Sequence, residues 1–200
     1  IPEVAWLSPR LLLSQTCGLP LVQNLRGRVS VLGRFCFQGQ PPSGDYHSVI
    51  IVRDTAAAEN FESLLGQRAA INHELSYSGC LALKRWVSLV ATGDGGFSRV
   101  ITTGSHRESV RAIAAGLADI AAIDCVSWSL ARRFDSIAKS LKVVARTDDR
   151  PGLPLITAIG SSPRMIDTLR IALDEAIRTL DPTNRDTLGI TGFVAADDVE

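Results

Sequence analysis

Two serine-bearing segments, each directly after a predicted strand, have the residue types of anion-binding helix starts. One carries Ser76 and Ser78, and the other carries Ser105 and His106. In a parallel α/β domain both segments lie at the carboxyl edge of the sheet, where ligands usually bind. Unpaired backbone N–H groups and the helix dipole favour an anion at such a point. The pattern predicts an anion site, although Ser76 and Ser105 also fit a simple helix-capping role.

Two further side chains at this predicted edge could take part in binding. His106 would stand in the first turn of its helix, where it could donate to an anion or lie at the surface. Asp124 ends an apolar strand. Its carboxylate could pair with a ligand amine, accept from a protonated phosphoryl oxygen, or cap the following helix. The sequence leaves these alternatives open.

Patterns of known catalytic and metal sites are missing from the sequence. It has no G-x-S-x-G nucleophile motif, no phosphate loop and no H-E-x-x-H zinc motif. The histidines at 47, 73 and 106 lack metal-ligand spacing. Cys80 or Cys125 could form a nucleophile pair with His106, but a buried structural cysteine is the more typical role. We therefore predict a protein that is not an enzyme and has no cofactor or metal.

The composition narrows the classes of partner. The 200 residues are 46% hydrophobic and carry 21 basic and 21 acidic side chains, which gives a formal net charge of zero. A nucleic-acid-binding protein normally has a basic face, so we expect no nucleic-acid partner. The apolar runs at 49–52 and 87–91 are far shorter than the roughly 20 residues of a membrane-spanning helix. We expect no membrane insertion.

Alternating strand and helix patterns predict an α/β fold with a largely parallel sheet. Strands are predicted at 29–37, 48–52, 68–72, 99–103, 120–124, 141–147 and 155–159, and helices around 60–65, 83–90, 105–116, 127–134 and from 162 onward, with a flexible loop at 93–96. Polar or proline-rich turns near 53–55 and 150–154 divide the chain into two lobes. We predict a discontinuous first lobe of residues 1–53 and 151–200 and a second lobe of residues 54–150. The two crossings would form a hinge beside a ligand-binding cleft.

Five segments occur in an order and spacing that resemble one protein family. They are Tyr46–Val52, Leu64–Ala70, Ser76–Gly79, Thr103–His106 and Ala122–Asp124. From about Ser14 to Ile159 the chain resembles the substrate-binding proteins of phosphate, phosphite and phosphonate ABC importers. The resemblance implies a two-lobed type II periplasmic binding protein fold, with mixed or parallel sheets flanked by helices. It also implies an ABC permease as partner and a periplasmic or extracytoplasmic location.

The same resemblance implies a ligand site in the cleft between the lobes. A small anion (phosphate, phosphite or phosphonate) would meet the Ser-x-Ser-Gly helix start and the Gly-Ser-His turn. The implied ligand-binding residues are Tyr46, Ser76, Tyr77, Ser78 and His106, with Asp124 facing the rest of the ligand and Ser14 and Gln15 contributing from the first lobe. The family usually has threonine where this chain has Tyr77, whose bulkier phenol would shrink the pocket or reorient the anion.

Three further expectations follow from the resemblance. Family members normally have an N-terminal strand–helix unit before the segment that begins here, so we expect an incomplete first lobe. Export permits disulfides, and Cys17–Cys36 is the expected bridge, with Cys80 and Cys125 near the cleft. The alternatives to a transport role are a ligand-sensing effector module of the same fold or a cysteine-dependent enzyme that uses the same cleft.

Overall fold

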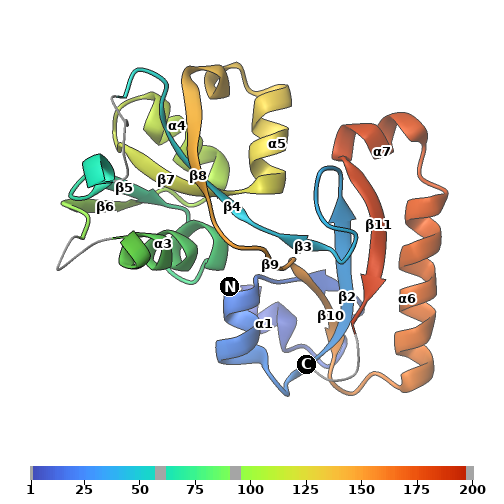
Figure 1. Cartoon of the computed structure of the whole chain (residues 1–200). Helices are drawn as coiled ribbons and strands as arrows, with labels where there is room; N and C mark the ends of the chain where they lie inside the picture. The colour runs from blue at the N-terminus through green and yellow to red at the C-terminus, as the bar shows by residue number, and fades with distance from the viewer. Residues whose placement is uncertain (1, 57–61, 91–95, 197–200) are drawn as a thin grey trace. The chain divides into compact units, whose positions relative to one another are not determined.

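The computed structural model describes residues 2–56, 62–90 and 96–196 and divides the chain into two compact units (Figure 1). Unit 1 comprises Ile1–Tyr46 and Arg150–Glu200, and unit 2 comprises His47–Asp149. Most of the loop predicted at 93–96 and the first residues of the helix predicted at 60–65 lie outside the described residues. The described remainder of that helix is one 3-10 turn, η2 (Glu62–Leu64).

The boundary between the units differs from the one predicted at residue 53. Strand β4 (Ser48–Arg53) belongs to unit 2, because it pairs with β7 (Ile120–Asp124) on one side and β8 (Leu141–Arg146) on the other. The turn at 53–55 therefore ends a strand inside unit 2 and does not connect the two units. The second boundary, between residues 149 and 150, falls beside the predicted position.

The sheet of unit 2 has five strands in the order β6-β5-β7-β4-β8. Strand β5 (Arg68–Ile71) runs parallel to β6 (Arg99–Thr102) and to β7, whereas β4 is antiparallel to both of its neighbours. The sheet is therefore mixed. The amino end of β4 consequently lies at the same edge as the carboxyl ends of β5, β6 and β7, where a polar site can form from several loops.

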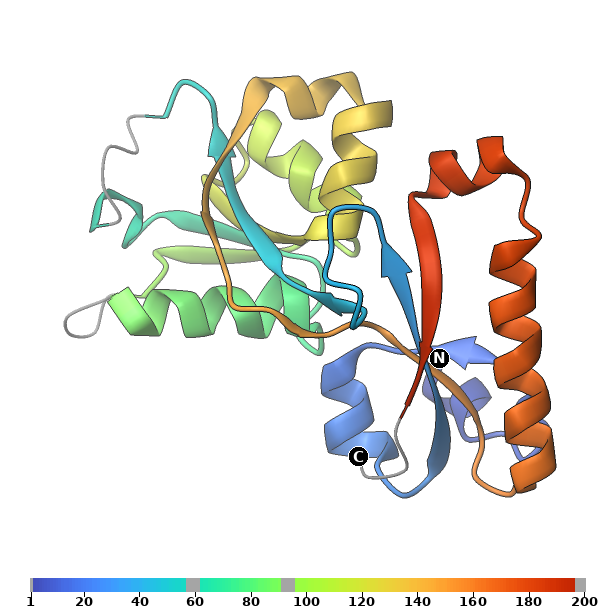
Figure 2. The same cartoon turned by 45° about the vertical axis from the view of Figure 1, so that its right-hand side comes forward.

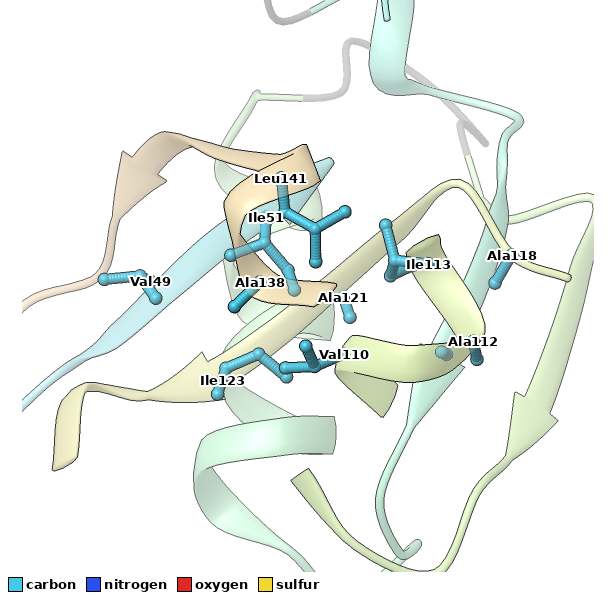
Figure 3. Close-up of a cluster of buried hydrophobic side chains, with 11 residues drawn as sticks. Val49, Ile51, Val110, Ala112, Ile113, Ala118, Ala121, Ile123, Ala138 and Leu141 are labelled. Carbon is cyan, nitrogen blue, oxygen red and sulfur yellow. The ribbon is translucent and has the colours of Figure 1, made fainter. Parts of the chain in front are cut away.

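Two apolar clusters, one on each face of this sheet, hold the helices of unit 2 in place. Besides η2, these helices are η3 (Tyr77–Leu81), α3 (Ala82–Val90), α4 (His106–Ala114), α5 (Cys125–Phe134) and η4 (Ser136–Ser140). Ile51 packs with Val110 and Ile113 of α4 (Figure 3), while its neighbour Ile50 packs with Leu83 and Trp86 of α3. The alternation follows from side chains pointing to opposite faces along a strand.

Unit 1 contains an antiparallel sheet, in contrast to the largely parallel sheet predicted. Its strands are β1 (Ser14–Gln15), β10 (Pro154–Ala158), β2 (Val29–Phe37) and β11 (Ile190–Ala195), in that order, and β3 (Asp45–Tyr46) pairs separately with β9 (Arg150–Pro151). The helices are α1 (Pro2–Trp6), α2 (Gly18–Pro20), η1 (Leu21–Leu25), α6 (Pro163–Arg178) and α7 (Pro182–Leu188). Helix α6 packs along β2 and β11 (Figure 2) and begins at the Ser162 cap, as predicted. Neither α7 nor β11 was predicted from the sequence.

The expected Cys17–Cys36 disulfide is wrong. All four cysteines are free thiols. Cys17 follows β1 and Cys36 lies on β2, and β10 lies between these two strands. Strands two positions apart in a sheet are separated by about 9–10 Å, beyond the roughly 7 Å between Cα atoms that a disulfide can span. The Cys36 thiol instead donates to the carbonyl oxygen of Pro42 at 3.4 Å.

Candidate anion-binding site

Four of the predicted site residues lie together at the carboxyl edge of the unit 2 sheet. The Ser78 hydroxyl oxygen lies 3.0 Å from His106 Nε2, and Asp124 Oδ2 lies 3.3 Å from the same nitrogen. Ser76 stands at the start of the helical turn that carries Ser78. Ser76, Ser78 and Asp124 are all buried. The residues that the sequence placed on three different loops thus form one compact polar cluster.

Three helical segments begin at this edge, and each has a side-chain cap. Ser76 Oγ accepts from Gly79 N at 3.1 Å at the start of η3, and Ser105 Oγ accepts from Glu108 N at 3.2 Å at the start of α4. Asp124 Oδ1 accepts from a backbone N–H in the first turn of α5 at 2.8 Å. The capping interpretation is therefore confirmed for all three residues. A cap satisfies only part of a first turn, so further N–H groups at these helix starts suit an anion.

The turn that carries Ser78 depends on a glycine and on a strand neighbour. A Cβ atom at Gly79 would lie 2.1 Å from Asn72 Oδ1 and 2.9 Å from His106 Cε1. Both distances are shorter than real Cβ contacts, so only glycine fits against these two side chains. On the other side, the Ser48 hydroxyl donates to the carbonyl oxygen of Ser78 at 2.9 Å. Gly79 in the Ser-x-Ser-Gly motif therefore allows η3 to lie directly against His106.

The electrostatics of the cluster favour a neutral imidazole. Burial lowers the pKa of His106, and the charge of Asp124 and the backbone carbonyl of Ala122 only partly oppose this. The hydroxyl of Ser78 and the carboxylate of Asp124 both meet Nε2. In a Ser-His-Asp catalytic triad the serine and the carboxylate contact different ring nitrogens, so this geometry does not relay a proton. The arrangement suits hydrogen bonding to a bound group.

The cysteines near this edge have no features of a nucleophile. Burial, together with the nearby charge of Asp124, raises the pKa of the Cys125 thiol to about 11. The thiolate is the reactive form of cysteine, so Cys125 is unreactive at neutral pH. Cys80 is buried in an apolar cluster. Across the described ranges, no group of three or more histidine, cysteine or acidic side chains is arranged to hold a metal ion.

The remaining predicted site residues have different surroundings. Tyr77 is the first residue of η3 and is partly exposed. Tyr46, Ser14 and Gln15 belong to unit 1: Tyr46 is buried in β3, the Ser14 hydroxyl accepts from Trp6 Nε1 at 3.2 Å, and Gln15 is exposed. That these three residues share a site with unit 2 stays a prediction.

Two polar residues that contact the cluster were not predicted from the sequence. Asn72 Nδ2 lies 3.4 Å from His106 Nε2, and the Ser48 hydroxyl donates to the carbonyl oxygen of Ser78. Ser48 was assigned to the first lobe, whereas β4 belongs to unit 2. Asn72 comes directly after β5, so polarity at a strand end was the available signal.

The fold and this edge of polar helix starts define a solute-binding protein of the type II periplasmic class. Residues 12–200 match the family model described as "ABC transporter, phosphonate, periplasmic substrate-binding protein". The chain belongs to this family, which confirms the resemblance seen in its motifs. No curated protein matches the sequence. Among the described residues no helix has the length and apolar character needed to cross a membrane.

Solved structures share the fold at low sequence identity. A binding protein component of an ABC phosphonate transporter from Pseudomonas aeruginosa is 19% identical, with a TM-score of 0.75 over 93% of this chain and 64% of its own. PhnD1 from Prochlorococcus marinus in complex with methylphosphonate is 15% identical, with a TM-score of 0.75 over 93% and 73%. A Xanthomonas citri protein bound to ATP is 21% identical, with a TM-score of 0.69 over 92% and 71%. These likenesses confirm the predicted fold class.

Proposed function

We propose that this protein captures a phosphonate, or the related anions phosphite and phosphate, and delivers it to an ABC permease outside the cytoplasm. The observation that carries the proposal is the contact of Ser78 with His106 at 3.0 Å, beside the starts of η3 and α4. The family description and the methylphosphonate complex of PhnD1, a protein of similar fold, support this choice of ligand.

The proposed recognition uses neutral donors. The Ser78 hydroxyl and the first-turn N–H groups of η3 and α4 would donate to the phosphoryl oxygens, because donors at helix starts favour negative charge. Tyr77 would border the phosphoryl group. Tyr46, Ser14 and Gln15 would complete the site from unit 1 when the two units close around the ligand.

The carboxylate of Asp124 would select among anions. It lies 3.3 Å from His106 Nε2 and is buried, so a fully deprotonated anion brought against it is repelled. A phosphonate monoanion carries a P–OH group that can donate to the carboxylate, and an aminophosphonate carries an ammonium that can pair with it. Sulfate has neither group at neutral pH. We therefore expect phosphoryl anions to bind more tightly than sulfate.

A thermal-shift screen with methylphosphonate, phosphite, phosphate and sulfate tests the proposal. A ligand that binds the folded state raises the melting temperature once its concentration exceeds its Kd. We expect a rise with at least one phosphoryl anion, its loss in Ser78→Ala, and its retention in the control Ser129→Ala, which changes an exposed serine of α5. No rise with any phosphoryl anion, or an equal rise in Ser78→Ala, would contradict the proposal.

A binding protein leaves its ligand chemically unchanged. After incubation of methylphosphonate with the protein, ³¹P NMR should therefore show only the starting phosphonate.

A further inference from the structure

The side chain of Asn72 is held between the two loops that form the anion site. Its backbone carbonyl accepts from Gly104 N at 2.9 Å, which ties the end of β5 to the turn before α4. Its Nδ2 lies 3.4 Å from His106 Nε2. Its Oδ1 packs so closely against Gly79 that a Cβ atom at Gly79 would lie 2.1 Å away. One residue therefore contacts both halves of the Ser78–His106 cluster.

The hydrogen bonding of this amide is incomplete. Asn72 Oδ1 is buried and has no hydrogen-bond partner in the described part of the chain. A buried, unsatisfied carbonyl destabilises the folded state, and such groups in folded proteins call for an explanation. A different residue at this position would avoid the cost, which points to a role in the site and not in stability.

The contact with the ring favours one placement of the ring hydrogen. An amide nitrogen can only donate, so Asn72 Nδ2 requires the lone pair of His106 Nε2. The Ser78 hydroxyl can donate to the same lone pair. The carboxylate of Asp124, 3.3 Å from Nε2, favours a hydrogen there and hence the charged ring. Asn72 and Asp124 thus favour opposite states of one nitrogen.

We propose that Asn72 is a positioning residue of the anion site. Its amide donates to His106 Nε2 and keeps the ring neutral until a bound anion accepts the hydrogen bonds of Asn72 and Ser78. This inference rests on the proposed function. In the free protein the Asn72 amide and the Ser78 hydroxyl point at one neutral acceptor and are already oriented, which lowers the entropic cost of binding. When phosphoryl oxygens accept these two hydrogen bonds, Nε2 takes up a proton from solvent and donates to Asp124. Binding is therefore accompanied by proton uptake.

The groups that face His106 determine whether each substitution raises or lowers the pKa of His106. They are Asn72 after β5, Ser78 of η3, Asp124 at the end of β7 and the Ala122 carbonyl within β7. A hydrogen bond to the neutral form of a base lowers its pKa. Removal of the amide in Asn72→Leu should therefore raise the pKa of His106. Asn72→Asp, which keeps the shape and adds a negative charge, should raise it further.

The experiment follows the ring carbons of His106 by NMR over a pH titration in wild type, Asn72→Leu and Asn72→Asp. Asn184→Leu, an exposed asparagine of α7, is the matched control and should leave the titration unchanged. Addition of methylphosphonate to the wild type should raise the titration midpoint of His106. An unchanged midpoint in both Asn72 variants would overturn the proposal. A lower midpoint in Asn72→Leu would also overturn it, because the amide oxygen and not the N–H group would then face the ring.

A second readout links the contact to binding. Loss of the donor should weaken methylphosphonate affinity by about threefold to tenfold in Asn72→Leu, with a larger loss in Asn72→Asp. Equal affinity of wild type and Asn72→Leu would contradict a role in the site. If the wild type itself binds no phosphoryl anion, the proposed function fails, whereas the ligand-free titration still decides whether Asn72 positions His106.

Discussion

Two polar clusters lie at opposite edges of the unit 2 sheet, and they differ in how completely they are satisfied. At the amino edge, Asp119 accepts from Arg53 Nη2 at 2.9 Å and from both Nε and Nη2 of Arg68 at 2.8 Å. Arg53 Nη1 also donates to the carbonyl oxygens of Ile113 and Ala118. Both oxygens of Asp119 accept from these arginines, and the contacts join β4, β5 and the turn before β7.

The carboxyl edge is organised differently. Three side chains approach one nitrogen of His106, and the side-chain oxygen Oδ1 of Asn72 has no hydrogen-bond partner in the described part of the chain. Arg53 and Arg68 do not form an anion site at the amino edge, because both already donate hydrogen bonds to Asp119. Incomplete hydrogen bonding, and not formal charge, distinguishes the edge at which we propose that the ligand binds.

The largest effect on stability and binding is expected when a methyl group is added at Gly79, against which Asn72 and His106 pack. Gly79→Ala places a methyl group 2.1 Å from Asn72 Oδ1, so the Ser78 turn must move. We expect a loss of stability of about 1–3 kcal/mol, typical of overpacking, and a methylphosphonate affinity about a hundredfold lower. Denaturant unfolding and calorimetric titration measure the two quantities. The control Gly160→Ala, which meets no atom within 4 Å, should change neither. Normal binding by Gly79→Ala would show that the packing described here is not needed.

The second test separates the two edges. Asp119→Ala removes the acceptor shared by Arg53 and Arg68, so we expect the free energy of unfolding to fall by about 2 kcal/mol. Because the change lies at the opposite edge of the sheet, phosphonate affinity of the folded protein should remain within about twofold. Urea unfolding and calorimetry at a temperature well below melting give both values. A large loss of affinity without loss of stability would reverse the roles assigned to the two edges.

Acid should act on the two edges in separate stages. Burial lowers the pKa of His106, and the hydrogen bond from Arg68 holds the pKa of Asp119 below its usual range. Both groups bind protons more readily in the unfolded chain, so stability is full at higher pH and decreases on acidification. The stability contributed by His106 should be lost below about pH 6.5, and the stability contributed by Asp119 should be lost below about pH 4.

Urea midpoints between pH 8 and pH 3 measure these stages. His47, whose pKa burial also lowers, adds to the first stage, so His106→Gln should reduce that stage without abolishing it. Asp119→Asn should reduce only the second stage. A stability that rises on acidification from pH 7 to pH 5.5 would contradict the neutral state assigned to His106.

The smallest effect compares two helix caps of the same chemistry. Ser76 Oγ caps η3 in the site, and Ser162 Oγ caps α6 in unit 1. Replacement of either serine by alanine should cost about 1 kcal/mol of stability. Only Ser76→Ala should also weaken methylphosphonate binding, since only that cap orients the Ser78 turn. Equal affinities of the two variants would assign Ser76 a purely structural role.

The local features of the chain were predictable because short-range physics sets them. The Ser76, Ser105 and Ser162 caps follow from serine before a helical pattern, and β7 follows from an apolar run that ends in Asp124. The Ser-x-Ser-Gly and Gly-Ser-His segments were found because their order matches a family. These signals identified residues that the structure brings together in unit 2, namely Ser76, Ser78, His106 and Asp124.

The long-range features were not predictable in the same way. A strand pattern does not give strand direction, so the antiparallel course of β4 and the place of Ser48 in the site were missed. The Arg53–Asp119–Arg68 cluster joins residues far apart in sequence, with no local pattern to indicate it. The Cys17–Cys36 bridge failed because the position of β10 between their strands is a property of the assembled sheet.

Backbone amide shifts on addition of methylphosphonate can distinguish the two edges, because the Asp119 edge is the internal comparison. We expect large ¹H–¹⁵N shift changes at Ser78, Gly79 and His106, with the amides of Arg68 and Asp119 nearly unchanged. We expect no such changes with sulfate at the same concentration. Shifts concentrated at Arg68 and Asp119, or no saturable shift at Ser78 and His106, would contradict the assignment of the anion site to the carboxyl edge.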